Sequence, residues 1–317
     1  SEMCIRDRGE LKFFRPATAS GFGAVAALSK IQKFSMEEIH NALGIMYSQT
    51  CGNMQSHVEG VPILGLQVGF NAKAALASMD LTKAGFPGPK RVFNGEHGYF
   101  KLIENDDYDI LYLQENIGKL WMVNQLAHKP FPSGRLTHGL VHAIKVLKLK
   151  HGLNKDDIES IECFVPPGVY KLVARPIIDN LTTNYSKLCA KFVGASFMIN
   201  DHLNIETFTE KKYLNNKDTL NFAKKITMIK NDKLDQKVLT PQKFIITLVN
   251  NSKIEINIDH VYGHPKAPLS EKEYLEKFSK CCFSSTNKVD QNQVNRMLDF
   301  IFDLENKDNV IDFFKTI

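Results

Sequence analysis

The sequence contains no apolar stretch long enough to cross a membrane, since no run of 18 apolar residues occurs in its 317 residues. It also contains no apolar segment of the kind that directs secretion. Internal repeats and low-complexity tracts do not occur either. These absences exclude a membrane partner from the interpretation, and a cytoplasmic globular protein is expected.

A strong charge imbalance is lacking too. The formal net charge is +5, with 24% charged and 43% hydrophobic residues, which is ordinary for a globular protein. The positive residues are spread along the chain and form no basic stripe, so a nucleic-acid partner is not expected. The length favours two domains.

Metal-binding cysteine motifs are also missing. The six cysteines include no C-x-x-C spacing, so neither a zinc ribbon nor a redox pair is indicated. His138 and His142 have the i, i+4 spacing of a helical metal pair, but they lack the glutamate of H-E-x-x-H and an obvious third ligand. No metal site is therefore predicted.

Small-residue and amphipathic patterns predict three helices in the first part of the chain, at residues 19–32, 35–52 and 66–84. The first helix carries Gly21 and Gly23 on a face with little side-chain bulk, which lets another helix approach closely. Because β-α-β alternation is absent, residues 9–126 are predicted to form an all-helical domain.

The pattern changes after Lys129. Four β-branched segments predict strands, at residues 158–167, 225–232, 243–251 and 252–261, and "NNSK" suits a hairpin turn between the last two. Helical patterns are interleaved at residues 134–150, 185–202 and 214–225. Residues 127–260 are therefore predicted to form a mixed α+β domain.

Two capping boxes mark helix starts, one made by Ser35 with Glu38 and the other by Ser270 with Glu273. The second opens a C-terminal region whose apolar residues recur every three or four positions. Residues 261–317 are expected to return to the helical domain. The predicted fold is therefore mostly α, an all-helical domain with an inserted α+β lid domain.

The segment "HKPFPSGRLTHG" is the strongest candidate for chemistry. Pro130 and Pro132 restrict the backbone and make the turn rigid. Ser133 is a suitable N-cap for a following helix. In that geometry the helix N-terminus, Lys129 and Arg135 converge on one volume, which is predicted to hold an anion.

His138 follows one helical turn after Arg135 and shares its face with His142. A histidine at this position is a candidate proton carrier, or a group that orients proton transfer. The alternative from composition alone is that the prolines end a linker and the charges are simply solvated.

A second polar cluster lies in "GEHGYF", where Glu96, His97 and Tyr99 stand between and beside two glycines that permit close backbone approach. Surface polar residues at a helix start explain this cluster equally well. The same surface interpretation applies to residues 52–62, which include Gln55, His57 and Glu59.

Taken in order, six segments resemble the MmgE/PrpD family, which includes 2-methylcitrate dehydratases, cis-aconitate decarboxylases and iminodisuccinate epimerases. The segments are "RPATASGFGAVAAL", "ALGIMYSQTCGNMQ", "GEHGYF", "KPFPSGRLTHG", "AKFVGASFMIND" and "HPKAPLSEKEYLEKF". The resemblance implies a helical domain with an α+β lid, a site in the cleft between them, a homodimer, and no metal or organic cofactor. It also implies a lyase, either a hydro-lyase or a decarboxylase, or an epimerase.

The implied substrate is a small di- or tricarboxylic acid, and the implied chemistry is proton transfer at a carbon next to a carboxylate. Lys129, Arg135 and His138 match the family's "KP.P..R.TH" element, so the resemblance assigns His138 and Lys129 catalytic roles and Lys129 and Arg135 substrate binding. His97 and Tyr99, with Glu96, match a second element and are assigned substrate binding.

The chain also departs from the family pattern. Arg15 stands where the family's dehydratases have histidine, and Leu64 and Gln67 occupy a region where they have lysine and histidine. A substrate other than 2-methylcitrate is therefore expected. The family pattern also implies a longer helical region upstream, and residues 1–8 are expected to be non-native.

Two other functions stay open. A non-catalytic carboxylate-binding or dimer-forming module of the same fold is the main alternative, and polyanion binding through surface lysines is the weakest.

Overall fold

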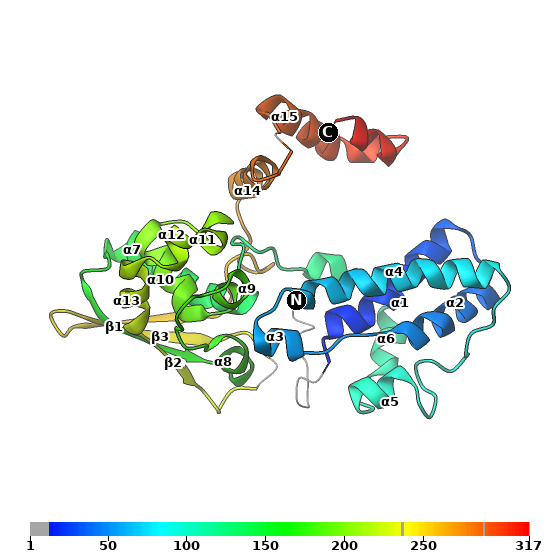
Figure 1. Ribbon diagram of the computed structural model, residues 1–317, viewed down its shortest axis with the longest axis horizontal. Helices are drawn as coiled ribbons and strands as arrows, with labels where there is room; N and C mark the ends of the chain where they lie inside the picture. Colours follow the sequence, from blue (N-terminus) through cyan, green and yellow to red (C-terminus); the bar gives the residue numbers. More distant parts are fainter. Residues whose placement is uncertain (1–12, 236–237, 288, 317) are drawn as a thin grey trace.

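The computed structural model describes residues 13–235, 238–287 and 289–316. The expectation about residues 1–8 concerns a segment outside these ranges. Figure 1 shows a helical domain and an α+β domain side by side, with a C-terminal pair of helices that extends away from both. Within the described ranges, no helix is both long and apolar enough to span a membrane.

The first part of the chain is helical, as predicted. Its helices are α1 (Arg15–Ile31), α2 (Met36–Gln49), α3 (Gln55–Glu59), α4 (Ile63–Lys83), α5 (Tyr99–Glu104) and α6 (Ile110–Asn116). The Ser35 capping box is confirmed, since the Ser35 and Glu38 side chains each bond the other residue's backbone N–H. Helices α1, α2 and α4 pack together around Val25, Met46 and Met79.

Only one of the two glycines singled out in α1 lies at a close helix contact. A Cβ atom built on Gly21 would lie 2.3 Å from Cε of Met46 in α2, so the absence of a side chain there allows the two helices to approach. Gly23 has no atom within 4 Å of such a Cβ. The prediction is therefore confirmed for Gly21 and wrong for Gly23, which faces away from the packed core.

The glycines of the helical domain provide a matched test of its packing. A Cβ on Gly44 in α2 would lie 2.4 Å from the backbone oxygen of Pro89, so we expect Gly44→Ala to lower the free energy of unfolding by about 1–3 kcal/mol. Gly23→Ala should raise it by about 0.5–1 kcal/mol, because alanine favours helix and meets open space. Urea unfolding of both variants checks this, and equal effects would contradict it.

The α+β domain contains one four-stranded sheet in the order β2-β1-β3-β4. Its strands are β1 (Ile158–Val165), β2 (Ile226–Lys230), β3 (Gln242–Leu248) and β4 (Lys253–Ile258). All four predicted strands are confirmed, and β3 and β4 form the predicted antiparallel hairpin. β1 pairs in parallel with β2 and antiparallel with β3, which makes the sheet mixed.

Helices cover this sheet and supply most of the domain core. They are α7 (His138–His151), α8 (Pro167–Val173), α9 (Thr183–Lys187), α10 (Ala190–Asn200), α11 (Glu206–Thr209), α12 (Lys211–Leu214) and α13 (Lys217–Lys224). Helix α10 is buried along most of its length and packs against α7 and α13. The core centres on Phe192, Phe244 and Ile144. A mostly helical fold with a small mixed sheet therefore agrees with the predicted fold class.

The C-terminal region differs from the expectation. Its elements are α14 (Glu271–Phe283), α15 (Gln291–Phe302) and two 3-10 turns, Leu304–Asn306 and Val310–Lys315. Figure 1 shows α14 and α15 extending from the α+β domain instead of returning to the helical domain. The predicted capping box at Ser270 is confirmed. The apolar side of α15 contacts the second of the two 3-10 turns, where the ring of Phe300 lies against that of Phe313.

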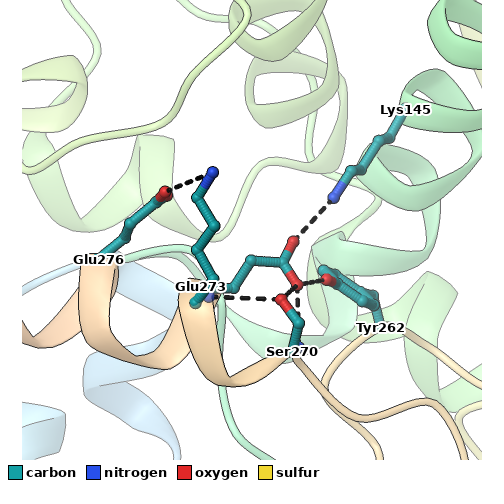
Figure 2. Close-up of polar contacts among 6 residues, drawn as sticks. Lys145, Tyr262, Ser270, Glu273 and Glu276 are labelled. Carbon is teal, nitrogen blue, oxygen red and sulfur yellow. Dashed lines mark hydrogen bonds and ion pairs between the residues drawn. The ribbon is translucent and has the colours of Figure 1, made fainter.

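A polar network attaches α14 to the α+β domain (Figure 2). The Glu273 carboxylate accepts a hydrogen bond from the Tyr262 hydroxyl and lies 3.3 Å from Nζ of Lys145 in α7. Partial burial opposes ionisation of Glu273, but hydrogen bonds from Tyr262, Ser270 and Lys145 outweigh it and lower its pKa to about 2. The carboxylate is therefore charged at neutral pH and holds the start of α14 in place.

Candidate active site

A pocket of about 400 Å³ lies between the helical domain and the α+β domain. The helical side contributes residues 56–57 of α3, residues 60–62, and residues 64–65 at the start of α4. The α+β side contributes Lys129, residues 132–134, Asn184 and residues 187–188. The rigid "KPFPS" turn therefore does face a cavity shared by the two domains.

Helix α3 is held directly against the α+β domain. The Arg175 guanidinium donates a hydrogen bond of 2.6 Å to the backbone oxygen of His57, and Met54 packs against the core of the α+β domain. Burial, together with the charge of Arg175, lowers the pKa of His57 to about 4. His57 is therefore neutral at neutral pH and adds no positive charge to the pocket that it lines.

The turn that carries Lys129 is also tied to α9. The Gly134 N–H donates a hydrogen bond of 2.8 Å to the backbone oxygen of Lys187. A Cβ on Gly134 would lie 2.8 Å from Cδ2 of Leu188, so glycine permits this close approach. The predicted helix at 185–202 is accordingly two helices, and the end of α9 brings Lys187 to the same pocket as Lys129.

Ser133 lines the pocket and connects it to His138. The Ser133 hydroxyl lies 2.9 Å from Nε2 of His138 and 3.0 Å from the hydroxyl of Thr137, which donates to the Gly134 carbonyl. In the described part of the chain, Nδ1 of His138 is buried without a hydrogen-bond partner. Because an unpaired buried N–H is costly, we assign the proton to Nε2, which donates to Ser133. Ser133 then donates to Thr137.

His138 itself is fully buried, with 0% of its surface exposed. Burial, followed by the charges of Arg135 and Lys129, lowers its pKa to about 3. Among the described residues that line the pocket, Ser133 is the one to which this neutral, enclosed imidazole is hydrogen-bonded. Of the two roles predicted for His138, orientation fits this geometry, whereas direct proton exchange with a pocket ligand does not.

Arg135 lies away from this pocket. Its guanidinium is 7% exposed and donates hydrogen bonds to the backbone oxygens of Tyr262 at 2.9 Å and Val261 at 3.3 Å. Arg135 is not among the residues that line this pocket, so the structure does not place it beside Lys129 there, and its role in substrate binding stays a prediction. The helix also begins with a 3-10 turn at Arg135, and Ser133 is not its N-cap, because the Ser133 hydroxyl is bonded to His138 and Thr137 instead.

The second predicted cluster lies elsewhere in the helical domain. Tyr99 is buried in its core, and its hydroxyl is 3.0 Å from that of Thr18. Burial raises the pKa of Tyr99 to about 12, while His97 is exposed. Figure 1 shows α5 away from the α+β domain, so the structure does not bring His97 and Tyr99 to the pocket with Lys129.

Arg15, which replaces the family histidine, lies near Tyr99 and forms an ion pair of 2.6 Å with Glu104. Of the other two departures, Leu64 lines the pocket, whereas Gln67 is buried and bonds the backbone of Asn53. Leu64 therefore places an apolar side chain in the pocket wall.

Sequence reasoning missed Lys187 and Asn184 as pocket residues. A lysine at the end of a short helix has no local signature, and only its contact with the Gly134 turn reveals it. Among the residues that the structure describes, no group of three or more His, Cys, Asp or Glu side chains could hold a metal ion.

Fold and pocket together define a protein with a helical domain, an α+β domain and, between them, a pocket whose described lining includes two lysines. Sequence profiles of the MmgE/PrpD N-terminal and C-terminal domains match residues 1–110 and 131–299. The chain belongs to the MmgE/PrpD family.

Curated relatives agree with this assignment. Cis-aconitate decarboxylase of Mus musculus is 24% identical over 291 residues, covering 84% of this chain and 55% of the relative. The Homo sapiens cis-aconitate decarboxylase is 24% identical over 276 residues with the same coverage. Cis-aconitate decarboxylase-like protein oryM of Aspergillus oryzae is 21% identical over 306 residues, covering 90% of this chain and 61% of the relative. The chain thus spans little more than half the length of these relatives.

Proposed function

We propose that this protein is a lyase of the MmgE/PrpD type that acts on a small di- or tricarboxylic acid. The main support for this proposal is the composition of the pocket, which is lined by Lys129, Lys187 and Ser133. The described residues that line it include no Asp or Glu. Two lysine side chains that line one cleft favour anionic ligands. The names of the relatives, cis-aconitate decarboxylases, support an acid of this class.

In the proposed mechanism, Lys129 binds the carboxylate next to the reacting carbon. When a proton passes from that carbon to water, or carbon dioxide leaves it as a neutral molecule, the bonding electron pair stays behind and delocalises into the carboxylate as enolate-like charge. A fixed ammonium group stabilises the transition state, in which this charge develops, more than it stabilises the ground state. This difference lowers the barrier to reaction. The Ser133 hydroxyl, which accepts from His138 and donates to Thr137, is fixed in the wall of the same pocket.

Turnover in D₂O tests this proposal. The 317-residue chain is incubated with cis-aconitate, 2-methylcitrate and iminodisuccinate, and proton NMR follows each acid. We expect one acid to lose carbon dioxide or water, to epimerise, or to exchange a C–H proton next to a carboxylate for deuterium. Heat-denatured protein is the control. Binding without any of these changes would contradict the catalytic proposal.

That outcome would favour the second candidate, a non-catalytic carboxylate-binding module. One observation supports it: His138 is enclosed, and among the described residues that line the pocket the titratable side chains are Lys129, Lys187 and neutral His57. Calorimetry with the same acids distinguishes the two candidates, because the module predicts binding without turnover.

A homodimer is also proposed. The segment from α6 to the 3-10 turn Met122–Gln125 exposes large apolar side chains, including Ile117, Trp121 and Val123. Contiguous exposed apolar groups are typical of protein interfaces. Sedimentation equilibrium measures the mass directly, and a monomer at micromolar concentration would contradict the proposal.

A further inference from the structure

We infer that Arg135 is a positioning residue, which acts on the pocket by holding the turn at residues 129–134 against the segment at residues 261–263. This turn supplies four residues to the pocket, namely Lys129, Pro132, Ser133 and Gly134. The inference rests on the proposed function, in which the turn contacts the substrate. It gives Arg135 a role in the site that requires no contact with a ligand.

Both ends of the turn are bound to the same three residues. Directly before the turn, the His128 N–H donates a hydrogen bond of 2.8 Å to the backbone oxygen of Gly263. Directly after it, the Arg135 guanidinium donates to the backbone oxygens of Tyr262 at 2.9 Å and Val261 at 3.3 Å. Residues 261–263 therefore form a clamp that fixes the two ends of the turn.

Gly263 brings the clamp into direct contact with the start of the turn. Its φ of +85° lies in the left-handed region, which favours glycine. A Cβ atom built on Gly263 would lie 2.0 Å from the backbone oxygen of His128 and 3.4 Å from Cδ of Pro130. Any side chain at position 263 would therefore push the clamp and the turn apart.

The clamp is itself fixed to the α+β domain. Val261 is 1% exposed and belongs to the core of that domain. The Tyr262 hydroxyl donates to the Glu273 carboxylate, and Nζ of Lys145 lies 4.4 Å from the centre of the Tyr262 ring (Figure 2). Because Lys145 belongs to α7 and Glu273 to α14, two helices hold the clamp in place.

The Arg135 guanidinium is suited to this role by its charge and its burial. It is 7% exposed, and it bonds two carbonyl groups of the clamp at once. Charge-assisted hydrogen bonds of this kind are stronger than neutral ones. Loss of the guanidinium releases one end of the turn, and a displacement of about 1 Å at a site can lower its efficiency by up to about 10²-fold.

A double-mutant cycle separates positioning from direct binding by Arg135. Isothermal titration calorimetry measures the binding of succinate, a small dicarboxylate, to the 317-residue chain, to Arg135→Met, to Gly263→Ala and to the double variant. We expect each single substitution to weaken binding about tenfold. The double variant should be weakened no more than about 20-fold, because both substitutions release the same turn.

Two results of this cycle would overturn the inference. Additive losses, about a hundredfold in the double variant, would show that Arg135 contacts the ligand independently of the clamp. Wild-type affinity in either folded single variant would show that the clamp does not position the turn.

Two further variants serve as controls. Gly85→Ala imposes a similar backbone penalty, since Gly85 has a φ of +87°, but a Cβ atom there would meet no atom within 4 Å. It should lower stability and leave the affinity for succinate unchanged. Arg135→Lys keeps a charged donor and should lose less affinity than Arg135→Met. Circular dichroism confirms that each variant is folded.

Hydrogen exchange followed by NMR tests the clamp without a ligand. The His128 amide, which donates to Gly263, should exchange slowly in the wild type and at least about tenfold faster in Arg135→Met. Amides in the middle of α7 should keep their protection. Unchanged exchange of the His128 amide would overturn the inference even if Gly263→Ala does not fold.

The outcomes also separate this inference from the proposed function. If the cycle and the exchange rates are as expected but no acid is turned over in D₂O, the clamp positions a binding turn of the non-catalytic module, and the inference stands. If an acid is turned over while Arg135→Met and Gly263→Ala keep wild-type affinity, the inference is overturned and the proposed function stands. If the wild type does not bind succinate, the exchange rate of the His128 amide decides the inference by itself.

Discussion

Replacement of Lys129 by methionine should lower kcat/KM for the accepted acid by about 10²–10³-fold, the usual loss when one fixed donor to a developing negative charge is removed. The reason is geometric. Pro130 and Pro132 restrict the backbone beside Lys129, so the backbone that carries this side chain is fixed at the pocket wall and loses little conformational freedom on binding. Methionine keeps most of the length of the side chain and removes its charge.

Steady-state kinetics with the acid identified by NMR measures this effect. If Lys129 acts on the transition state, kcat falls; if it only binds the ground state, KM rises while kcat is retained. Lys150→Met is the matched control, since Lys150 is an exposed lysine near the end of α7 that does not line the pocket. Unchanged kinetics in Lys129→Met would remove Lys129 from the mechanism.

Mild acid should destabilise the protein through His138. Its pKa is about 3 in the folded protein and 6.5 when unperturbed, so between these values the unfolded chain binds a proton that the folded chain excludes. The contribution of His138 to the free energy of unfolding is therefore fully present above about pH 6.5 and declines as the pH falls toward about 3. At about pH 5 the loss from this residue should be about 2 kcal/mol.

Urea unfolding at several pH values between about 7.5 and 5 checks this prediction, in a range above the usual titration of carboxylates. His138→Gln keeps a polar side chain beside Ser133 and lacks the titrating group, so its stability should depend less steeply on pH. His151→Gln, at the exposed end of α7, should keep the wild-type slope. Parallel curves for wild type and His138→Gln would show that the imidazole is not excluded from protonation.

Much of the fold followed from local patterns. Periodicity and β-branched runs predicted α2, α4 and all four strands. Each of these elements buries one face, and the apolar residues of that face recur at a fixed spacing along a short stretch of sequence. Both capping boxes were found for the same reason, since the side chain and the N–H that it binds are three residues apart.

The candidate site was predicted only in part. The prolines beside Lys129 predict a rigid turn, which singles out Lys129 as a candidate site residue. Arg135 was assigned to the anion because it stands beside Lys129 in sequence, yet its guanidinium binds carbonyl groups more than a hundred residues away. Long-range acceptors of this kind leave no local signal.

The sequence by itself determined the elements of this protein, its family and the stiff basic turn at residues 129–134, because these depend on residues close together in the chain. Tertiary structure alone decided which charges meet. It enclosed His138 behind Ser133, turned Arg135 toward the protein interior and brought Lys187 to Lys129. The physical reason is that burial and ionic contacts depend on which residues lie close together in space. Backbone hydrogen bonds between distant segments, such as that from Gly134 to Lys187, fix this proximity only in the folded chain.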